Sequence, residues 1–123
     1  MNDKFYELLD RTGFVFLDGG FGTMLQATGV EIGHNPELLN ITNPDVIMNI
    51  HRQYVESGSD IVYANTFGAN RYKLKNSGYT VAEVVSAGIA IAKKAASGKA
   101  LVALDIGPIG QLLEPSGTLT FEE

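Results

Sequence analysis

Three apolar runs in this chain, residues 14–17, 61–64 and 100–104, each end in a polar, glycine-rich turn. Carboxylate, amide and hydroxyl groups in such turns can bond a polar ligand, and glycine lets the backbone approach a ligand closely. We therefore take the residues of the turns as candidate ligand contacts: Asp18, Gly19, Gly20, Asn65, Thr66, Phe67, Asp105, Gly107 and Pro108.

Each of these positions also has a purely structural interpretation. Asp18 precedes two glycines, which suits a turn or a helix cap as well as a ligand contact. Asn65 and Thr66 could satisfy local backbone groups, while Phe67 could pack beneath its loop. Asp105 could bond loop N–H groups, so the residue types alone leave both possibilities open.

Helical patterns separate the apolar runs. We predict one long helix that begins at Asn43 and Pro44, a good cap followed by a good first residue, and ends at Gly58. A second begins at Thr80, with a capping box to Glu83, and ends near residue 98. Because a helix connects each run to the next, the runs are predicted to be parallel strands with the turns at their carboxyl ends.

Shorter elements complete the pattern. Residues 4–10, 21–27 and 69–76 are predicted to be short helices, and a long loop begins at residue 107. Gly88 interrupts the second long helix and could permit close packing against a strand. His51 is expected to be a packing or surface residue of the first long helix, because chemistry in barrels lies at strand ends.

The predicted fold class is α/β, with about three β-α units of parallel strands. A closed parallel barrel has eight strands and about 250 residues, so 123 residues could supply only its N-terminal portion. An open sheet of this size would leave two apolar edges exposed. We therefore expect residues 1–123 to be either part of a barrel domain or a module that pairs with another chain.

Composition narrows the possible functions. The chain has 9 basic and 14 acidic residues, a net charge of −5, which argues against binding nucleic acid. It has no cysteine and 2 histidines, so it offers no thiolate metal site. No run approaches the roughly 20 apolar residues of a membrane span, and residues 1–4 do not resemble a signal peptide. We expect a cytoplasmic protein without a membrane partner.

Several longer motifs resemble those of a known family. The segments 17–26, 36–40, 43–54 and 57–69 and the motif at residues 105–110 resemble the homocysteine S-methyltransferase domain, and they occur in the family's order. Within that family, the chain is most similar to the N-terminal module of cobalamin-dependent methionine synthases. The resemblance extends from about Phe14 to the end of the chain.

The resemblance implies the N-terminal part of a (β/α)8 barrel, in which homocysteine binds as a thiolate on zinc. The methyl group would come from methylcobalamin, recharged from methyltetrahydrofolate on other modules of the parent protein. Asp18 would accept from the substrate amino group, and the backbone N–H groups of Gly19 and Gly20 would approach the ligand. The family's zinc ligands are cysteines of later strands, which this sequence lacks, so the chain alone is expected to be inactive and to hold no catalytic residue.

Three alternatives remain open from the sequence. The chain could be a binding module that self-associates through its sheet edges. It could belong to an enzyme with another methyl donor, because betaine and S-methylmethionine enzymes share these early strands. It could also belong to a different small-molecule enzyme that uses the same first strands of a barrel, because a fold does not determine a function.

Overall fold

The computed structural model describes residues 3–122 and centres on a small parallel sheet. Strand β1 (Ile61–Tyr63) pairs with β2 (Leu101–Ala103), so that Ile61 lies opposite Leu101. Leu17 forms a parallel bridge to Ile61 on the other edge of β1. The predicted order of three parallel segments is thus present, with β1 in the middle. Residues 1–2 and 123 of the predicted domain lie outside the described residues.

The predicted strand at residues 14–17 is reduced to that single bridge. The bridge is made by bonds from Ile61 N to Phe16 O at 3.1 Å and from Asp18 N to Ile61 O at 3.0 Å, and Asp60 N also donates to Phe16 O at 2.8 Å. The side chains of Phe14 and Phe16 are 58% and 59% exposed. The segment therefore lies beside β1 without forming a regular ladder with it.

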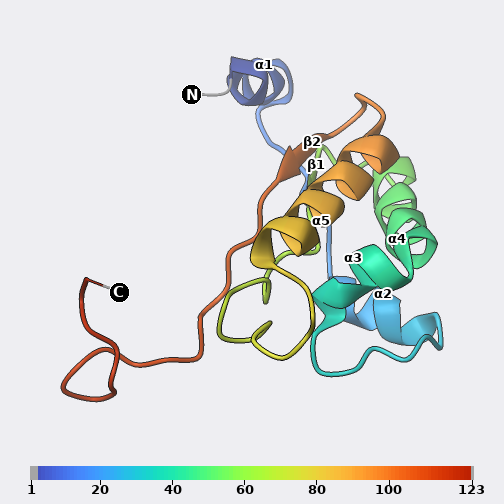
Figure 1. Cartoon of the computed structure of the whole chain (residues 1–123). Helices are drawn as coiled ribbons and strands as arrows, with labels where there is room; N and C mark the ends of the chain where they lie inside the picture. Colours follow the sequence, from blue (N-terminus) through green and yellow to red (C-terminus); the bar gives the residue numbers. More distant parts are fainter. Residues whose placement is uncertain (1–2, 123) are drawn as a thin grey trace.

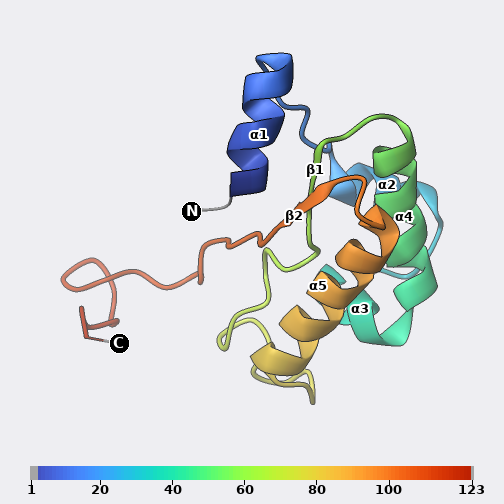
Figure 2. The same cartoon turned by 90° about the horizontal axis from the view of Figure 1, so that it is seen from above.

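The two predicted long helices are present, and they cover one face of the sheet (Figure 1). They are α4 (Pro44–Glu56) and α5 (Val81–Ala96), and they pack side by side (Figures 1 and 2). The capping box between Thr80 and Glu83 is present at the start of α5. Asn43 occupies the predicted N-cap position and Pro44 begins α4, although the Asn43 side chain makes no capping bond.

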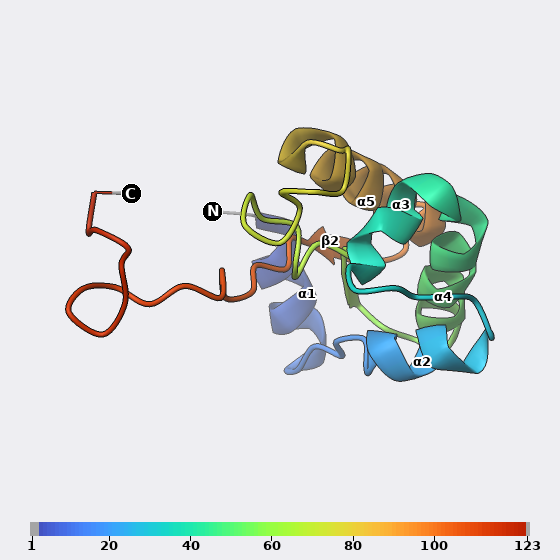
Figure 3. The ribbon, with the colours of Figure 1, turned by 60° about the horizontal axis from the view of Figure 1, so that its bottom comes forward.

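The interior is built from the facing sides of these elements. Its largest fully buried side chains come from α2, α4, β1 and α5: Leu25, Ile47, Ile50, His51, Val62 and Val84. Leu25 lies on α2 (Phe21–Ala27), which matches the predicted helix and packs beside α4 (Figure 3). Burial of these apolar side chains stabilises the helix-on-sheet arrangement, at about 1.5–3 kcal/mol for a fully buried aliphatic residue.

The connection between α2 and α4 contains two short helical pieces. They are η1 (Pro36–Leu38), a 3₁₀-helix, and α3 (Leu39–Thr42), which packs against both α4 and α5. No helix was predicted for this region, so the structure adds order here that the sequence pattern did not indicate.

The helix predicted for residues 69–76 is absent; the structure has turns there. Asn70 Oδ1 accepts from the N–H groups of Tyr72 and Lys73, at 3.1 and 3.0 Å, as an N-cap does, and the Asn70 carbonyl accepts from the Leu74 N–H at 3.0 Å. This single helical turn is not continued into a helix. The prediction of a helix was therefore wrong at this segment.

The two ends of the described chain lie away from the helical layer. Helix α1 (Asp3–Thr12) contains the predicted helix 4–10 and has no buried residue. After β2 the chain runs outward as an extended, looped segment, as predicted (Figures 1 and 2). Among residues 3–122, no helix has the length and apolar character that crossing a bilayer would require.

Candidate functional site

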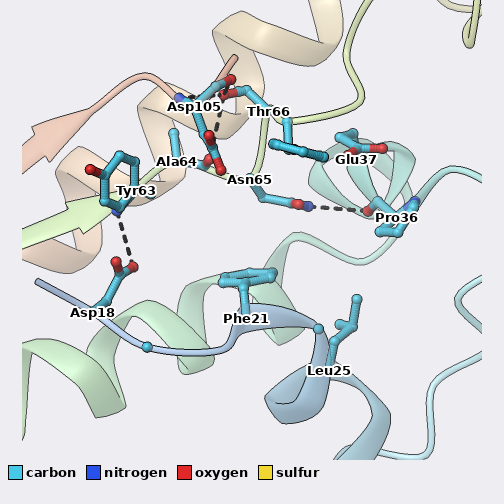
Figure 4. A pocket seen from close by; sticks show the side chains of 13 residues that line it. Asp18, Phe21, Leu25, Pro36, Glu37, Tyr63, Ala64, Asn65, Thr66 and Asp105 are labelled. Carbon is cyan, nitrogen blue, oxygen red and sulfur yellow. Dashed lines mark hydrogen bonds between the residues drawn. The ribbon is translucent and has the colours of Figure 1, made fainter. Parts of the chain in front are cut away.

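A cavity of about 340 Å³ lies at the carboxyl ends of the parallel segments (Figure 4). It is formed by the turns after residue 17, β1 and β2, together with the start of α2 and η1. Its lining residues are Asp18, Gly19, Phe21, Gly22, Leu25, Pro36, Glu37, Tyr63, Ala64, Asn65, Thr66, Phe67 and Asp105. The structure thus brings most of the candidate residues to one cavity; Gly20, Gly107 and Pro108 do not line it.

Asp18 joins the first turn to β1. Its Oδ2 accepts from the Tyr63 N–H at 3.0 Å, the bond drawn between these residues in Figure 4. Burial raises the pKa of the Asp18 carboxyl, and repulsion from Asp105 adds to the effect, while the bond from Tyr63 opposes it. A cation placed in the cavity would reverse this shift, because it would favour the ionised carboxylate.

The two glycines after Asp18 differ in position. Gly19 lines the cavity, and a Cβ there would lie 3.2 Å from the Tyr54 hydroxyl oxygen. Gly20 precedes α2, and its carbonyl accepts from the Tyr54 hydroxyl at 3.1 Å and the Thr23 hydroxyl at 2.9 Å. The close approach of Tyr54 therefore requires small residues in this turn.

Asn65 is buried, and its side chain is directed toward η1 and α3. Its Nδ2 donates to the Pro36 carbonyl at 3.1 Å and to Asn40 Oδ1 at 3.0 Å (Figure 4 shows the first). Asn40 returns a bond, from its Nδ2 to the Asn65 carbonyl at 2.8 Å. Because both N–H groups of Asn65 are committed, only its Oδ1 could bond a ligand.

Thr66 links the turn after β1 to the turn after β2. Its hydroxyl donates to the Asp105 carbonyl at 2.8 Å and accepts from the Asp105 N–H at 3.1 Å. The structural role considered for Thr66 is thus observed across strands, and also within its own turn, where the hydroxyl lies 3.4 Å from the Ala64 carbonyl oxygen. Asp105 lines the cavity beside it.

Phe67 forms part of the wall and is 48% exposed. Its carbonyl accepts from the Gly107 N–H at 3.0 Å. A Cβ at Gly107 would lie only 2.6 Å from that carbonyl oxygen, so the close approach of the two loops requires glycine. Lys73 Nζ lies 5.6 Å from the centre of the Phe67 ring. Pro108 is exposed beyond the cavity.

The sequence interpretation missed two buried polar residues next to this wall. Glu37 and Asn40 belong to the motif at residues 36–40, but neither is among the predicted site residues. Both are buried, and Glu37 lines the cavity. The signal in the sequence was a carboxylate and an amide, Glu37 and Asn40, within the otherwise apolar stretch 36–40. Polar side chains in such a stretch are often buried in a hydrogen-bonded network.

His51 is a packing residue, which is one of the two roles expected from the sequence. It is fully buried on α4, and its ring centre lies 5.2 Å from that of Phe21. Neither ring nitrogen has a hydrogen-bond partner among the described residues. Burial lowers the pKa of His51 to about 4, so the imidazole is neutral at physiological pH.

The cavity has an acidic character. Three carboxylates line it, those of Asp18, Glu37 and Asp105, and no Lys, Arg or His does so among residues 3–122. Within the same described range, no group of three His, Cys, Asp or Glu side chains could hold a metal ion. The arrangement is therefore suited to the cationic end of a small ligand rather than to metal ligation by these residues.

Comparison with known proteins agrees with this geometry. Methionine synthase of Mycobacterium tuberculosis is 43% identical over 90 residues, which cover 64% of this chain and 7% of that protein. Homocysteine S-methyltransferase 1 of Zea mays is 35% identical over 75 residues, covering 58% of this chain and 23% of that protein. The chain thus spans less than a quarter of either relative.

Solved structures show the same fold. The metallated form of the homocysteine methyltransferase MmuM from Escherichia coli superposes with a TM-score of 0.76 at 23% identity, over 85% of this chain and 41% of that one. Its oxidized form gives a TM-score of 0.79 at 22% identity, over 89% and 42%. The α/β fold with parallel strands is therefore shared with that enzyme.

A sequence model describing the homocysteine S-methyltransferases matches residues 15–123, which include both strands, both long helices and all the turns of the cavity. With a match over nearly the whole chain, this protein belongs to the homocysteine S-methyltransferase family.

Proposed function

We propose that this chain forms the homocysteine-binding side of a homocysteine S-methyltransferase that converts homocysteine into methionine. The observation that carries the proposal is the acidic cavity at the carboxyl ends of parallel segments, in a chain that belongs to this family. Active sites of parallel barrels lie at that end of the strands.

Asp18 is the proposed contact for the substrate ammonium group. Its carboxyl is half-buried, and burial raises its pKa by disfavouring the ionised form, so a cationic group beside it would offset that cost. The backbone N–H groups of Gly19 and Gly20 are the proposed donors near the substrate carboxylate. Thr66 and Asp105 then form the opposite side of the cavity.

The turn after β1 supplies the proposed walls. Asn65 offers its carbonyl oxygen, and Phe67 offers an apolar surface to the methylene groups of the substrate. Gly107 lets the two loops approach, and Pro108 restricts the backbone that follows. These are binding roles, and we propose no catalytic residue within this chain.

We further propose that the parent enzyme is a complete (β/α)8 barrel that uses zinc. Zinc lowers the pKa of a bound thiol, so that homocysteine is a thiolate at neutral pH. Residues 3–122 do not fit a zinc site, so its ligands would lie elsewhere in the protein. The E. coli homocysteine methyltransferase MmuM has been solved in a metallated form, which supports a metal in this family.

The proposed methyl donor is methylcobalamin, recharged from methyltetrahydrofolate on other modules. Support comes from the mycobacterial relative, which is named a methionine synthase and is much longer than this chain. The maize relative is named a homocysteine S-methyltransferase, which keeps a betaine or S-methylmethionine type of donor as the second candidate. Assays of the complete gene product with each donor in turn would distinguish these types.

The chain alone is proposed to be inactive. Calorimetry with L-homocysteine and zinc should detect no tight complex with the 123-residue chain, whereas the complete gene product should bind both. Tight stoichiometric zinc binding by the chain alone would contradict the proposal, and so would a complete gene product that fails to methylate homocysteine with any of the donors.

One observation favours a second possibility, a self-associating module. The segment 14–17, which lies beside β1, has exposed side chains at Phe14, Phe16 and Leu17. Leu104 and Ile106 are exposed after β2. Exposed apolar edges favour pairing between chains. Sedimentation of the chain would show a discrete dimer under this alternative, and a monomer or ill-defined aggregate under the leading proposal.

A further inference from the structure

Glu37 is a buried carboxylate at the edge of the cavity, and the binding roles proposed above do not use it. It is 5% exposed, and its Oε1 accepts from the Gly68 N–H at 2.7 Å. A carboxylate this far from water costs free energy unless hydrogen bonds or a cation compensate it. The short bond to Gly68 is the compensation that the described residues provide.

The absence of a side chain at Gly68 leaves room for that carboxylate. A Cβ at this position would lie 2.7 Å from Oε1 and 2.9 Å from Oε2 of Glu37. Gly68 is not among the glycines with positive φ, so alanine would be allowed by the backbone itself. The space around Gly68 is therefore restricted by Glu37 rather than by the conformation of the turn.

Glu37 accepts a hydrogen bond from a peptide unit whose carbonyl is also hydrogen-bonded. The N–H of this unit belongs to Gly68 and donates to Glu37, and its carbonyl belongs to Phe67 and accepts from the Gly107 N–H at 3.0 Å. Fixing a planar peptide unit at both ends fixes its orientation. The Phe67 side chain, which lines the cavity, leaves the backbone at the adjoining Cα.

We propose that Glu37 is a positioning residue for the cavity: through the Phe67–Gly68 peptide it sets the place of the Phe67 wall and hence the affinity for homocysteine. This inference rests on the proposed function, because homocysteine is the ligand that it concerns. Glu37 acts through Gly68 and does not itself touch the ligand. Position 37 requires a side-chain oxygen that can accept the hydrogen bond from the Gly68 N–H, and it does not require the negative charge.

Calorimetric titration of the complete gene product with L-homocysteine tests the proposal. Glu37→Gln keeps an oxygen that can accept from Gly68, so its Kd should stay within about threefold of the wild type. Glu37→Ala removes the acceptor, and its Kd should rise by about tenfold or more. Glu31→Ala, an exposed carboxylate of the same connecting segment, is the matched control and should leave Kd unchanged.

The titration separates positioning from a merely structural role. A variant in which part of the protein stays misfolded throughout the titration lowers the binding stoichiometry and leaves the Kd of the folded fraction unchanged. Reversible unfolding instead raises the apparent Kd at an unchanged stoichiometry, and thermal unfolding of the variant detects it. Positioning raises the Kd at an unchanged stoichiometry in a variant that thermal unfolding shows to be fully folded at the assay temperature. Rescue by glutamine adds a second distinction, because it restores the hydrogen bond without restoring the charge.

Gly68→Ala tests the same contact from the other side, and it carries the test if Glu37→Ala does not fold. Alone, it should raise the Kd by displacing the carboxylate. Combined with Glu37→Ala, it should add little, since the atoms that it meets are gone; a double-mutant cycle measures this non-additivity. Full additivity of the two changes would overturn the proposed contact.

The remaining outcomes are equally distinct. If the wild type binds homocysteine and Glu37→Ala binds it equally well, the inference is wrong while the proposed function stands. If Glu37→Gln is as weak as Glu37→Ala, the charge itself is needed, and the positioning role is overturned. If the wild-type gene product does not bind homocysteine, the proposed function fails, and the inference fails with it.

Discussion

Replacing Thr66 by valine would remove the hydroxyl that connects the two turns after β1 and β2, with little change of shape. That hydroxyl makes two bonds to the backbone of Asp105, at 2.8 and 3.1 Å. At roughly 1 kcal/mol net for each bond, the link between the turns should weaken by about 1–2 kcal/mol. The lower end applies if water reaches Asp105, which is only partly buried.

Amide hydrogen exchange at Asp105 measures this link directly. Its N–H donates to the Thr66 hydroxyl, so Thr66→Val should speed its exchange by about 5–30-fold, at 1.4 kcal/mol for each factor of ten. Thr66→Ser keeps the hydroxyl and should stay near the wild type. Thr42→Val is the control, because Thr42 is exposed and its hydroxyl bonds only within its own helical segment, to Leu38 O at 3.3 Å.

The reasoning fails if exchange at Asp105 is the same in Thr66→Val as in the wild type. It also fails if Thr66→Ser is as fast as Thr66→Val, since the hydroxyl would then not be the group that matters. Either result would mean that the turn after β2 is held by contacts other than Thr66.

Three further predictions concern the same region. Gly107→Ala places a Cβ 2.6 Å from the Phe67 carbonyl oxygen, so we expect a loss of about 1–3 kcal/mol of stability, seen in thermal unfolding, and weaker homocysteine binding by calorimetry. Gly88→Ala should also destabilise, although alanine favours helix by about 1 kcal/mol, because its Cβ meets the buried Asn40 amide at 2.7 Å; denaturant titration measures the net sign. The pKa of Asp18 is raised in the fold, so its contribution to stability should fall as pH rises from its ordinary value through the raised one, and Asp18→Asn should lack this slope. Homocysteine affinity should instead rise over that range in the wild type, as the carboxylate ionises, and lose this dependence in Asp18→Asn.

Local patterns were sufficient to predict the main elements. Glycine and proline mark the bounds of α4, the Thr80–Glu83 capping box marks the start of α5, and β-branched residues identify β1. These features act within a few residues of the chain, which is why a single sequence reveals them. The position of the cavity followed from the parallel order, since turns after parallel strands meet at one edge.

Contacts between distant residues were not predictable in this way. Glu37 bonds Gly68 across 31 positions, and Asn40 bonds Asn65 across 25. No periodicity in the sequence indicates which backbone group a buried carboxylate or amide will meet. The turn at Asn70 shows the converse error: the local signals for a helix are present, including an N-cap bond pattern at Asn70, but only one turn forms.

The charge of the cavity constrains how an amino-acid ligand would lie in it. Asp18, Glu37 and Asp105 all face the cavity, and no basic side chain among residues 3–122 lines it. The carboxylate of a bound amino acid would be repelled by these groups, and its ammonium group would be attracted. We therefore expect the ammonium group to lie near Asp18 and the carboxylate to meet backbone N–H groups. The thiol would then point away from the carboxylates, toward the side where the proposed zinc would lie.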